Sequence, residues 1–286
     1  MLSFRPGLRS GHFYVLWAIG WPPIVMTLEY INELFSKTLI GDYEDDAPWT
    51  AVRELRRIGS REVFDKAAEW CRSKESRLRA RGLDVLAQIG KTIDHPSNVF
   101  PDESFSLVAS TLKDEQEIQP LDSAIAALGH LDNPAGIPLI IQFQSHPNSH
   151  IRFAVACALG SFPNDPQSTE SLLLLMKDPD EDVRDWATFG IGVLCDLDSV
   201  EIRDALFQRL SDSNEDVREE AMAGLSKRRD QRVLPSLLAA LAETAVSSRV
   251  IEATCDMLDM QANPADWSTD SYASALRERF GFHSGQ

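Results

Sequence analysis

The 286-residue sequence has few of the residues that build disulfide frameworks and structural metal sites. Its four cysteines, Cys71, Cys157, Cys195 and Cys255, lie far apart, and no C-x-x-C pair occurs. This spacing argues against a disulfide scaffold and against a zinc site. We expect the cysteines to be small core residues, as free cysteines often are, in a cytoplasmic protein.

Basic residues are also scarce. The chain has 28 Lys and Arg against 44 Asp and Glu, which gives a formal net charge of −16. Binding to nucleic acid or to an anionic membrane through a broadly basic surface is therefore disfavoured, and a partner attracted by long-range electrostatics is expected to be basic. The charge is uneven: residues 178–220 hold 14 acidic residues and four arginines, whereas residues 52–81 hold ten basic residues against five acidic ones.

Motifs that mark several enzyme and metal sites are missing. No Walker loop, G-x-S-x-G or H-E-x-x-H sequence occurs. His146 and His150 are four residues apart, but Pro147 lies between them, so a shared helical face is not expected. We therefore predict no catalytic residues, no metal site and no cofactor.

No apolar run reaches the length of about 20 residues that a membrane-spanning helix needs. Residues 13–28 follow two arginines and imitate a secretory signal, but Pro22 and Pro23 interrupt the run and no cleavage site follows. We expect no membrane association. Residues 1–25 are interpreted as an N-terminal extension that is not translated, with Met26 as the natural start.

Sustained alternation of apolar and polar residues, the pattern of a half-buried strand, is absent, whereas an internal repeat is present. Three stretches align without gaps: IRFAVACALG from Ile151, VRDWATFGIG from Val183 and VREEAMAGLS from Val217. Weaker copies start at Ala47, Leu78, Pro120 and Arg249. Successive starts are 31 to 34 residues apart, except for one interval of 42, so the pattern indicates seven units.

Each unit is predicted to form two helices. Apolar residues recur at helical spacing in the first half, and Asp, Asn or Ser precedes a second apolar run. One such pair cannot bury its apolar face alone, so the units are expected to stack. We predict an all-α fold, an α-solenoid of about seven helix pairs over residues 47–262, with capping helices in residues 26–46 and 263–286. Residues 91–106 are expected to form a lengthened loop.

The repeated motif D-x-x-V-R-x-x-A-x-x-x-L-G runs from Asp180 to Gly192 and, with small departures, from Ser213 to Ser226. It resembles HEAT repeats, specifically the short bacterial kind called PBS-lyase HEAT-like repeats. Residues 171–250 also resemble HEAT-repeat proteins associated with Rhs-type polymorphic toxins, for which an immunity role has been proposed. This resemblance implies toxin binding and neutralisation without catalysis.

Some proteins with this repeat are enzymes. The iron-dependent deoxyhypusine hydroxylases use repeated His-Glu pairs, and none of the six histidines here is followed by Glu. Phycobilin lyases need a tetrapyrrole-binding groove, so a PBS-lyase-like enzyme or accessory protein acting on a bilin-type chromophore is one alternative. A HEAT-like nucleic-acid-binding module that uses the basic residues 53–81 is the other, and the acidic net charge disfavours it.

The favoured interpretation is a non-catalytic scaffold that binds another protein, with a toxin-neutralising immunity protein as the sharper form. The partner is expected to be basic and to be steered by the acidic second half. Oligomeric state and binding face stay open at this point. The predicted partner-binding residues are acidic and aromatic side chains: Asp182, Asp185, Trp186, Phe189, Glu201, Asp204, Glu219 and Glu220.

Two aromatic residues in this set and a row of arginines outside it each allow a structural alternative. Trp186 and Phe189 are three apart on one predicted helix and can equally pack between units. The repeated arginines Arg152, Arg184 and Arg218 could form a phosphate ladder. We favour pairing with carboxylates or helix ends of adjacent units, since Asp182 and Asp216 are near in sequence.

Overall fold

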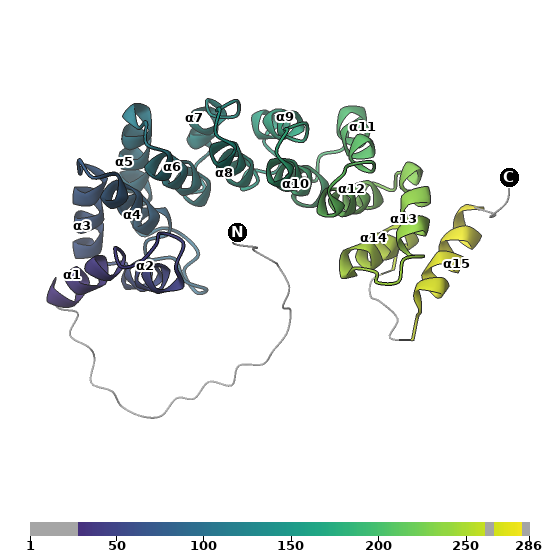
Figure 1. Cartoon of the computed structure of the whole chain (residues 1–286), viewed down its shortest axis with the longest axis horizontal. Coiled ribbons are helices and arrows are strands. Elements are labelled where there is room, and N and C mark those ends of the chain that lie inside the picture. Colours follow the sequence, from purple (N-terminus) through teal and green to yellow (C-terminus); the bar gives the residue numbers. More distant parts are fainter. Residues whose placement is uncertain (1–27, 261–265, 282–286) are drawn as a thin grey trace.

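The computed structural model describes residues 28–260 and 266–281, and this part of the chain forms a curved rod of paired helices (Figure 1). The inner side of the arch is lined by α2 (Asp46–Ile58), α4 (Ser76–Ala87), α6 (Ile118–His130), α8 (Ser149–Leu159), α10 (Glu181–Phe189), α12 (Glu215–Lys227) and α14 (Ser248–Leu258). The outer layer consists of α1 (Leu28–Lys37), α3 (Arg61–Cys71), α5 (Pro101–Asp114), α7 (Ile137–Ile141), α9 (Pro166–Leu175), α11 (Val200–Arg209), α13 (Leu234–Ala240) and α15 (Thr269–Phe280).

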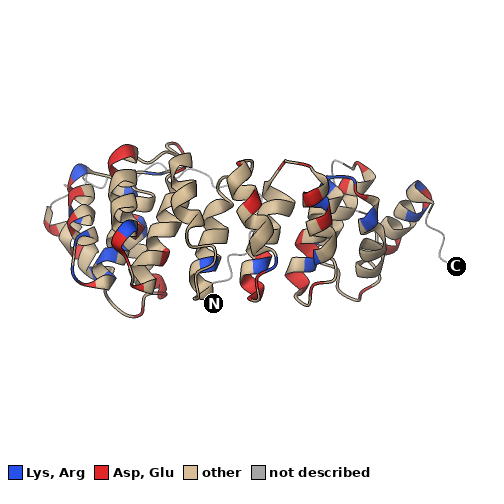
Figure 2. Ribbon diagram, turned by 90° about the horizontal axis from the view of Figure 1, so that it is seen from above, with Lys and Arg blue, Asp and Glu red and all other residues tan. Residues whose placement is uncertain are grey.

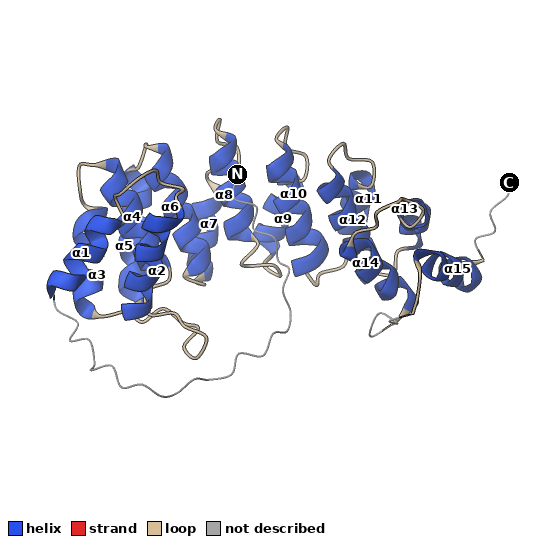
Figure 3. Cartoon of the chain, turned by 60° about the horizontal axis from the view of Figure 1, so that its bottom comes forward, coloured by secondary structure: helices blue, strands red, loops and turns tan. Residues whose placement is uncertain are grey.

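Three short helical segments complete the described elements. The 3₁₀ helices η1 (Pro134–Gly136) and η3 (Gln231–Val233) lead into α7 and α13, and the π-helix η2 (Gly190–Leu194) continues α10. No strand occurs in the described ranges (Figure 3). Each unit is one inner helix followed by one outer helix, from α2–α3 to α14–α15. The predicted α-solenoid of about seven helix pairs is confirmed.

Side-chain caps start the inner helices of the second half, α8, α10, α12 and α14. Asn148 accepts a hydrogen bond from the backbone N–H of His150, and Asn214 accepts one from Val217. Asp180 accepts two, from Asp182 and Val183. These bonds satisfy N–H groups of the first turn that have no partner inside the helix. Because helices of about ten residues are marginal alone, the caps set register while packing between units supplies stability.

The second half of the rod contains a direct contact between two helix backbones. A Cβ built on Gly224 of α12 would lie 2.6 Å from the Cα of Gly192 in η2, and one built on Gly192 would lie 2.7 Å from the carbonyl oxygen of Glu220. Only glycine lets the two elements approach so closely. The Gly192–Gly224 contact therefore sets the spacing of α10 and α12.

A buried arginine holds the π-helix in place. Arg228, 7% exposed, donates from all three guanidinium nitrogens to backbone carbonyls. The acceptors are the carbonyl oxygens of Ile191, Gly192, Cys195, Leu197 and Gly224. Carbonyls that leave the usual helical pattern need other donors when they are buried, and Arg228 supplies them.

The prediction that residues 91–106 form a loop is wrong at its C-terminal end, because α5 already begins at Pro101. Proline is tolerated at the first helical position, and Asp102 and Glu103 in the first turn favour a helix start. The loop that remains is held by Asn98, whose side chain donates to the carbonyl of Leu86.

The helices α1 and α15 lie at the two ends of the rod (Figure 1), inside the ranges 26–46 and 263–286 where capping helices are expected. The predicted extension, residues 1–25, lies outside the described residues. Within the described ranges, no helix combines the length and apolar character needed to cross a bilayer.

Candidate functional site

Neighbouring inner helices meet through two fixed positions of the repeat. Phe153 lies five residues after the cap of α8, and Trp186 lies six residues after the cap of α10. Their rings pack edge to face, with centroids 5.9 Å apart. One unit further on, Asp185 of α10 and Glu220 of α12 occupy the same two positions. An aromatic pair at one junction is thus replaced by a carboxyl pair at the next.

The aromatic side of this surface has three members. Trp186 packs edge to face against Phe189 on its own helix, with ring centroids 5.5 Å apart, as well as against Phe153. All three rings are half-buried, and Phe153 and Trp186 rest on the core. Predicted partner contact and core packing are therefore compatible for Trp186. We call Phe153, Trp186 and Phe189 the aromatic cluster.

The carboxyl side is more buried than a solvated acidic face. Glu220 is 2% exposed, and burial, with the charges of Asp185, Asp216 and Glu219, raises its pKa to about 8. Burial and the charge of Asp216 raise the pKa of the half-buried Asp185 to about 6. At neutral pH Glu220 is therefore mostly protonated, which weakens the long-range field expected from the sequence.

One arginine stands among these acids. Nη1 of Arg249, in the first turn of α14, lies 2.9 Å from Oε1 of Glu220, 3.8 Å from Oδ1 of Asp216 and 4.0 Å from Oε2 of Glu219. Two buried oxygens, Oδ1 of Asp185 and Oε2 of Glu220, have no hydrogen-bond partner in the described part of the chain. We call Asp185, Asp216, Glu219 and Glu220, with Arg249, the carboxyl cluster.

The structure divides the eight predicted binding residues between the two layers. Five of them belong to the two clusters, and exposed Asp182 lies beside them in the first turn of α10. Glu201 and Asp204 do not join them, because both lie on α11 in the outer layer. Asp204 pairs there with Arg232 at 2.6 Å. The inner surface at α8–α12 is therefore the better candidate site.

Phe153, Asp216 and Arg249 were not predicted as site residues. Phe153 shares a column of the gapless repeat alignment with Asp185 and Glu219, and that column is the signal that could have identified it. Arg249 was missed because the sequence alignment of the last repeat was shifted by one residue. Ser247 caps α14 as Asn214 caps α12, so Val250, rather than Arg249, occupies the position of Val217.

The repeated arginines are engaged in the framework. Arg152 makes a two-pronged ion pair with Asp178 at 2.6 and 2.8 Å, and Arg184 pairs with Asp212 at 2.9 and 3.0 Å. Each also donates to two carbonyl oxygens in the loop before its own helix. Arg79 and Glu115 repeat the pair at 2.7 and 2.9 Å. Each arginine thus joins consecutive inter-unit loops.

This arrangement corrects the expected partners. Pairing with carboxylates is observed, but the acceptors are Asp178 and Asp212 rather than Asp182 and Asp216. Helical side chains lean toward the N-terminus of their helix, which brings Arg184 toward the loops at that end. The guanidinium groups of Arg152 and Arg184 are therefore engaged in the framework, whereas the described bonds of Arg218 go through Nη1 to the carbonyl oxygens of Asp212 and Ser213. Two of the three arginines are thus not open to a phosphate backbone.

Comparison with known proteins identifies the family of the repeat. The family model of HEAT repeats matches residues 106–192 and 169–258, which together span more than half of the chain. The chain belongs to the HEAT-repeat family.

Relatives of this HEAT-repeat protein include Protein YibA of Escherichia coli strain K12, which is 31% identical over 240 residues and 82% of each chain. Phycocyanobilin lyase subunit alpha of Thermosynechococcus vestitus is 24% identical over 67% of this chain and 74% of the relative. The X-ray structure of E. coli YibA superposes with a TM-score of 0.66 at 26% identity, covering 88% of this chain and 94% of that one.

The basic stretch of this HEAT-repeat protein is largely compensated. Arg57 pairs with Glu54 at 2.7 Å. Arg81 is fully buried and binds Asp84 at 3.1 Å, with further bonds to backbone carbonyls. In Figure 2 basic and acidic residues are interleaved at this end of the rod, while the middle is mostly uncharged. The structure offers little support for a continuous basic surface.

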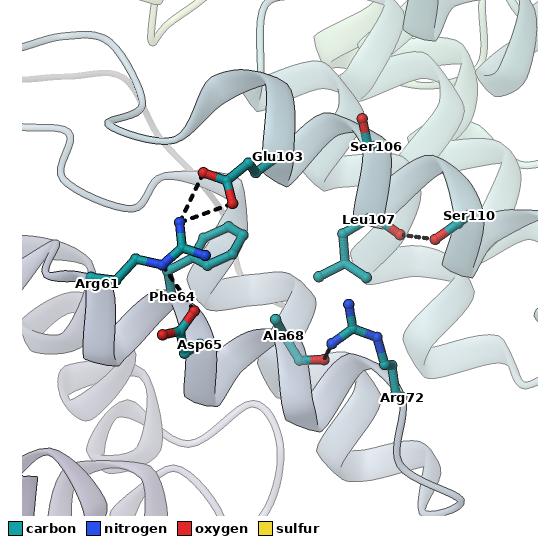
Figure 4. Close-up of a pocket in the computed structure, with 9 residues that line it drawn as sticks. All are labelled: Arg61, Phe64, Asp65, Ala68, Arg72, Glu103, Ser106, Leu107 and Ser110. Carbon is teal, nitrogen blue, oxygen red and sulfur yellow. Dashed lines mark hydrogen bonds and ion pairs between the residues drawn. The ribbon is translucent and has the colours of Figure 1, made fainter.

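A shallow hollow of about 470 Å³ lies between α3 and α5 in the outer layer (Figure 4). Arg61 points across it to Glu103 at 2.8 Å and also pairs with Asp65 at 2.9 Å. Arg72 donates to the carbonyl of Ala68. The charges of the hollow are matched within it, so it is a weaker candidate than the inner surface of this HEAT-repeat protein.

The described residues contain no group of three His, Cys, Asp or Glu side chains arranged to hold a metal ion. Burial also raises the pKa of the Cys71 thiol to about 12, so this cysteine is a poor nucleophile at neutral pH. The aromatic and carboxyl clusters are therefore the candidate site of the HEAT-repeat protein.

Proposed function

We propose that this HEAT-repeat protein is a non-catalytic scaffold that holds a basic protein partner on its inner surface between α8 and α12. The observation that supports it is the presence of two unlike clusters at successive junctions of the inner helices: half-buried aromatic rings on α8 and α10, and crowded carboxyl groups on α10 and α12. Rigid aromatic side chains anchor interfaces, and complementary charge orients the partner. A toxin domain neutralised by binding is one partner of this kind.

Site-specific photocrosslinking tests the proposal. A photoreactive amino acid replaces Phe189 on the inner surface or, as the control, Phe207, an exposed residue of outer helix α11. We expect a basic protein to be captured in the host from position 189 and not from position 207. The purified partner should then bind Trp186→Ala at least tenfold more weakly than the native protein. Capture from position 207 alone would count against the inner surface.

The similarity to phycocyanobilin lyase subunit alpha supports a second candidate, an accessory role with a bilin-type chromophore. Incubation of the purified protein with phycocyanobilin, followed by visible absorption, separates the two. A stable shift of the bilin band that is lost in Trp186→Ala favours the chromophore role. An unchanged spectrum leaves the scaffold as the function.

A further inference from the structure

A second hollow, of about 430 Å³, lies between the loop that precedes α8 and the end of α9. Much of its wall is apolar: Leu174 and Leu175 at the end of α9, and Pro147 and Pro179 in the loops before α8 and α10. Leu174 is 53% exposed. The ammonium group of Lys177, on the rim, makes no hydrogen bond or ion pair within the described part of the chain. The hollow thus offers an accessible apolar wall beside one uncompensated cation.

The next unit of the rod has polar side chains at this place. Asp178 and Asp212 are equivalent, because each accepts two bonds from a repeated arginine. Counted from them, Leu174 corresponds to Gln208, and the residue after Leu174 corresponds to Arg209. Arg209 pairs with Asp212 at 2.9 Å. The framework of the repeat therefore accommodates polar residues here and does not require the exposed leucine.

The loop between α4 and α5 (Figure 1) is the other feature that packing between units does not explain. It lengthens the interval between two repeats to 42 residues, where the others are 31 to 34. Ile93 in this loop is fully exposed. The next residue, Asp94, is also exposed, and its carboxylate has no hydrogen bond or ion pair among the described residues. An apolar side chain and an acid are thus displayed side by side.

Hydrogen bonds and packing hold this loop in shape. The N–H of Thr92 donates to the carbonyl of His95 at 2.8 Å, and the N–H of His95 donates to Oγ1 of Thr92 at 3.0 Å. At the base, Asn98 donates to a carbonyl of α4, and Val99 lies so close to Gly90 that a Cβ there would meet it at 2.3 Å. An ordered loop loses little conformational freedom when it binds.

We propose that the loop of one copy of this chain docks in the hollow of a second copy, with Ile93 against Leu174 and Asp94 paired with Lys177. The two features match in apolar character and are opposite in charge. The loop joins an inner helix to the next outer helix, whereas the hollow lies where outer helices lead into inner ones. These connections lie at opposite ends of the inner helices, so a copy does not fill its own hollow.

The geometry of the contact determines how copies assemble. Because two different surfaces meet, every added copy leaves one loop and one hollow free, and the assembly can grow beyond a pair. A contact through one loop is smaller than the interface of about 1,200–2,000 Å² that stable complexes bury, so we expect weak association. The contact surface does not include the aromatic and carboxyl clusters, so this inference goes beyond the proposed function.

Sedimentation velocity of the whole chain, from about 5 to about 500 μM, measures the association. The weight-average sedimentation coefficient of the native protein should rise with concentration. Ile93→Ser and Leu174→Gln, the second of which copies the next unit, should each weaken association about tenfold or more, because the apolar contact is lost. The matched control Val200→Ser removes a side chain that is 69% exposed on α11 and should associate like the native protein. Circular dichroism melting confirms that each variant is folded.

Mixing the two variants tests which surfaces meet. Leu174→Gln keeps a working loop and Ile93→Ser keeps a working hollow, so an equimolar mixture should form pairs that do not extend, although each variant alone stays monomeric. Charge reversal tests the ion pair. Asp94→Lys and Lys177→Glu should each weaken association on the order of threefold, and the chain with both changes should associate like the native protein.

A native protein that stays monomeric over the whole concentration range would overturn the inference. Association that Ile93→Ser leaves unchanged, or a mixture of the two variants without pairs, would also contradict it. None of these results bears on the scaffold, because photocrosslinking from position 189 tests the inner surface separately.

Discussion

The contact between Gly192 and Gly224 makes a sharp prediction about stability. In Gly224→Ala the new Cβ would lie 2.6 Å from the Cα of Gly192 and 2.9 and 3.0 Å from the methyl carbons of Leu206. The nearest atom is backbone, so side-chain rotation cannot relieve the clash. Overpacking of this kind costs about 1–3 kcal/mol, and alanine regains about 1 kcal/mol through its helix propensity. The net expectation is a loss of up to about 2 kcal/mol.

Differential scanning calorimetry of the whole protein measures the effect. A loss of this size should lower the melting temperature by up to about 8 °C in a chain of this length. Gly136→Ala is the matched control, since its Cβ would meet only Leu128 and Phe105 side chains at 3.5 Å or more. That variant should melt at or slightly above the native temperature, by up to about 1 kcal/mol of added stability. A melting temperature of Gly224→Ala equal to that of Gly136→Ala would refute the backbone contact.

Three further predictions concern the framework and the carboxyl cluster. Arg184→Ala should destabilise by about 2 kcal/mol in urea titration, because Asp212 loses two charge-assisted hydrogen bonds and keeps Arg209 as its ion-pair partner. Arg218→Ala, whose described bonds go to two carbonyl oxygens, should cost about 1 kcal/mol, and equal losses would contradict the ladder of ion pairs. Arg228→Met should lower the free energy of unfolding by at least about 3 kcal/mol in the same assay, because buried carbonyls around the π-helix lose their hydrogen-bond donor. A loss below about 1 kcal/mol would show that Arg228 does not hold the π-helix. Because the pKa of Glu220 is raised to about 8 from the ordinary 4.5, the folded protein keeps a proton that the unfolded chain has lost. The free energy of unfolding should therefore fall between about pH 5 and pH 8, by up to about 1.4 kcal/mol per pH unit. Glu220→Gln should flatten that slope, and an unchanged slope in the variant would show that Glu220 is ionised in the fold.

The stacking of helix pairs could be predicted because the signals for it are local. A helical spacing of apolar residues, followed by Asp, Asn or Ser before a second apolar run, recurs about every 32 residues, and each unit can bury its apolar face only against a neighbour. The same local logic missed the start of α5 at Pro101, since proline stops a helix in its interior and starts one at its first turn.

The candidate site could be predicted only in part. Trp186 and Asp185 were found because acidic and aromatic residues stand out in composition, but Glu201 and Asp204 carry the same chemistry and lie on the other layer. Nothing in the linear order separates them, because the layer depends on which helix of the pair a residue belongs to and which way that helix faces.

The sequence by itself determined the rod: its period, its helical class and its acidic second half. Tertiary structure alone decided which side chains meet across units. That choice depends on the offset between successive inner helices, which places the fifth residue after one cap against the sixth after the next. The offset arises from backbone contacts such as Gly192–Gly224 and from the ion pairs between loops, interactions between residues some 30 positions apart that no local pattern encodes.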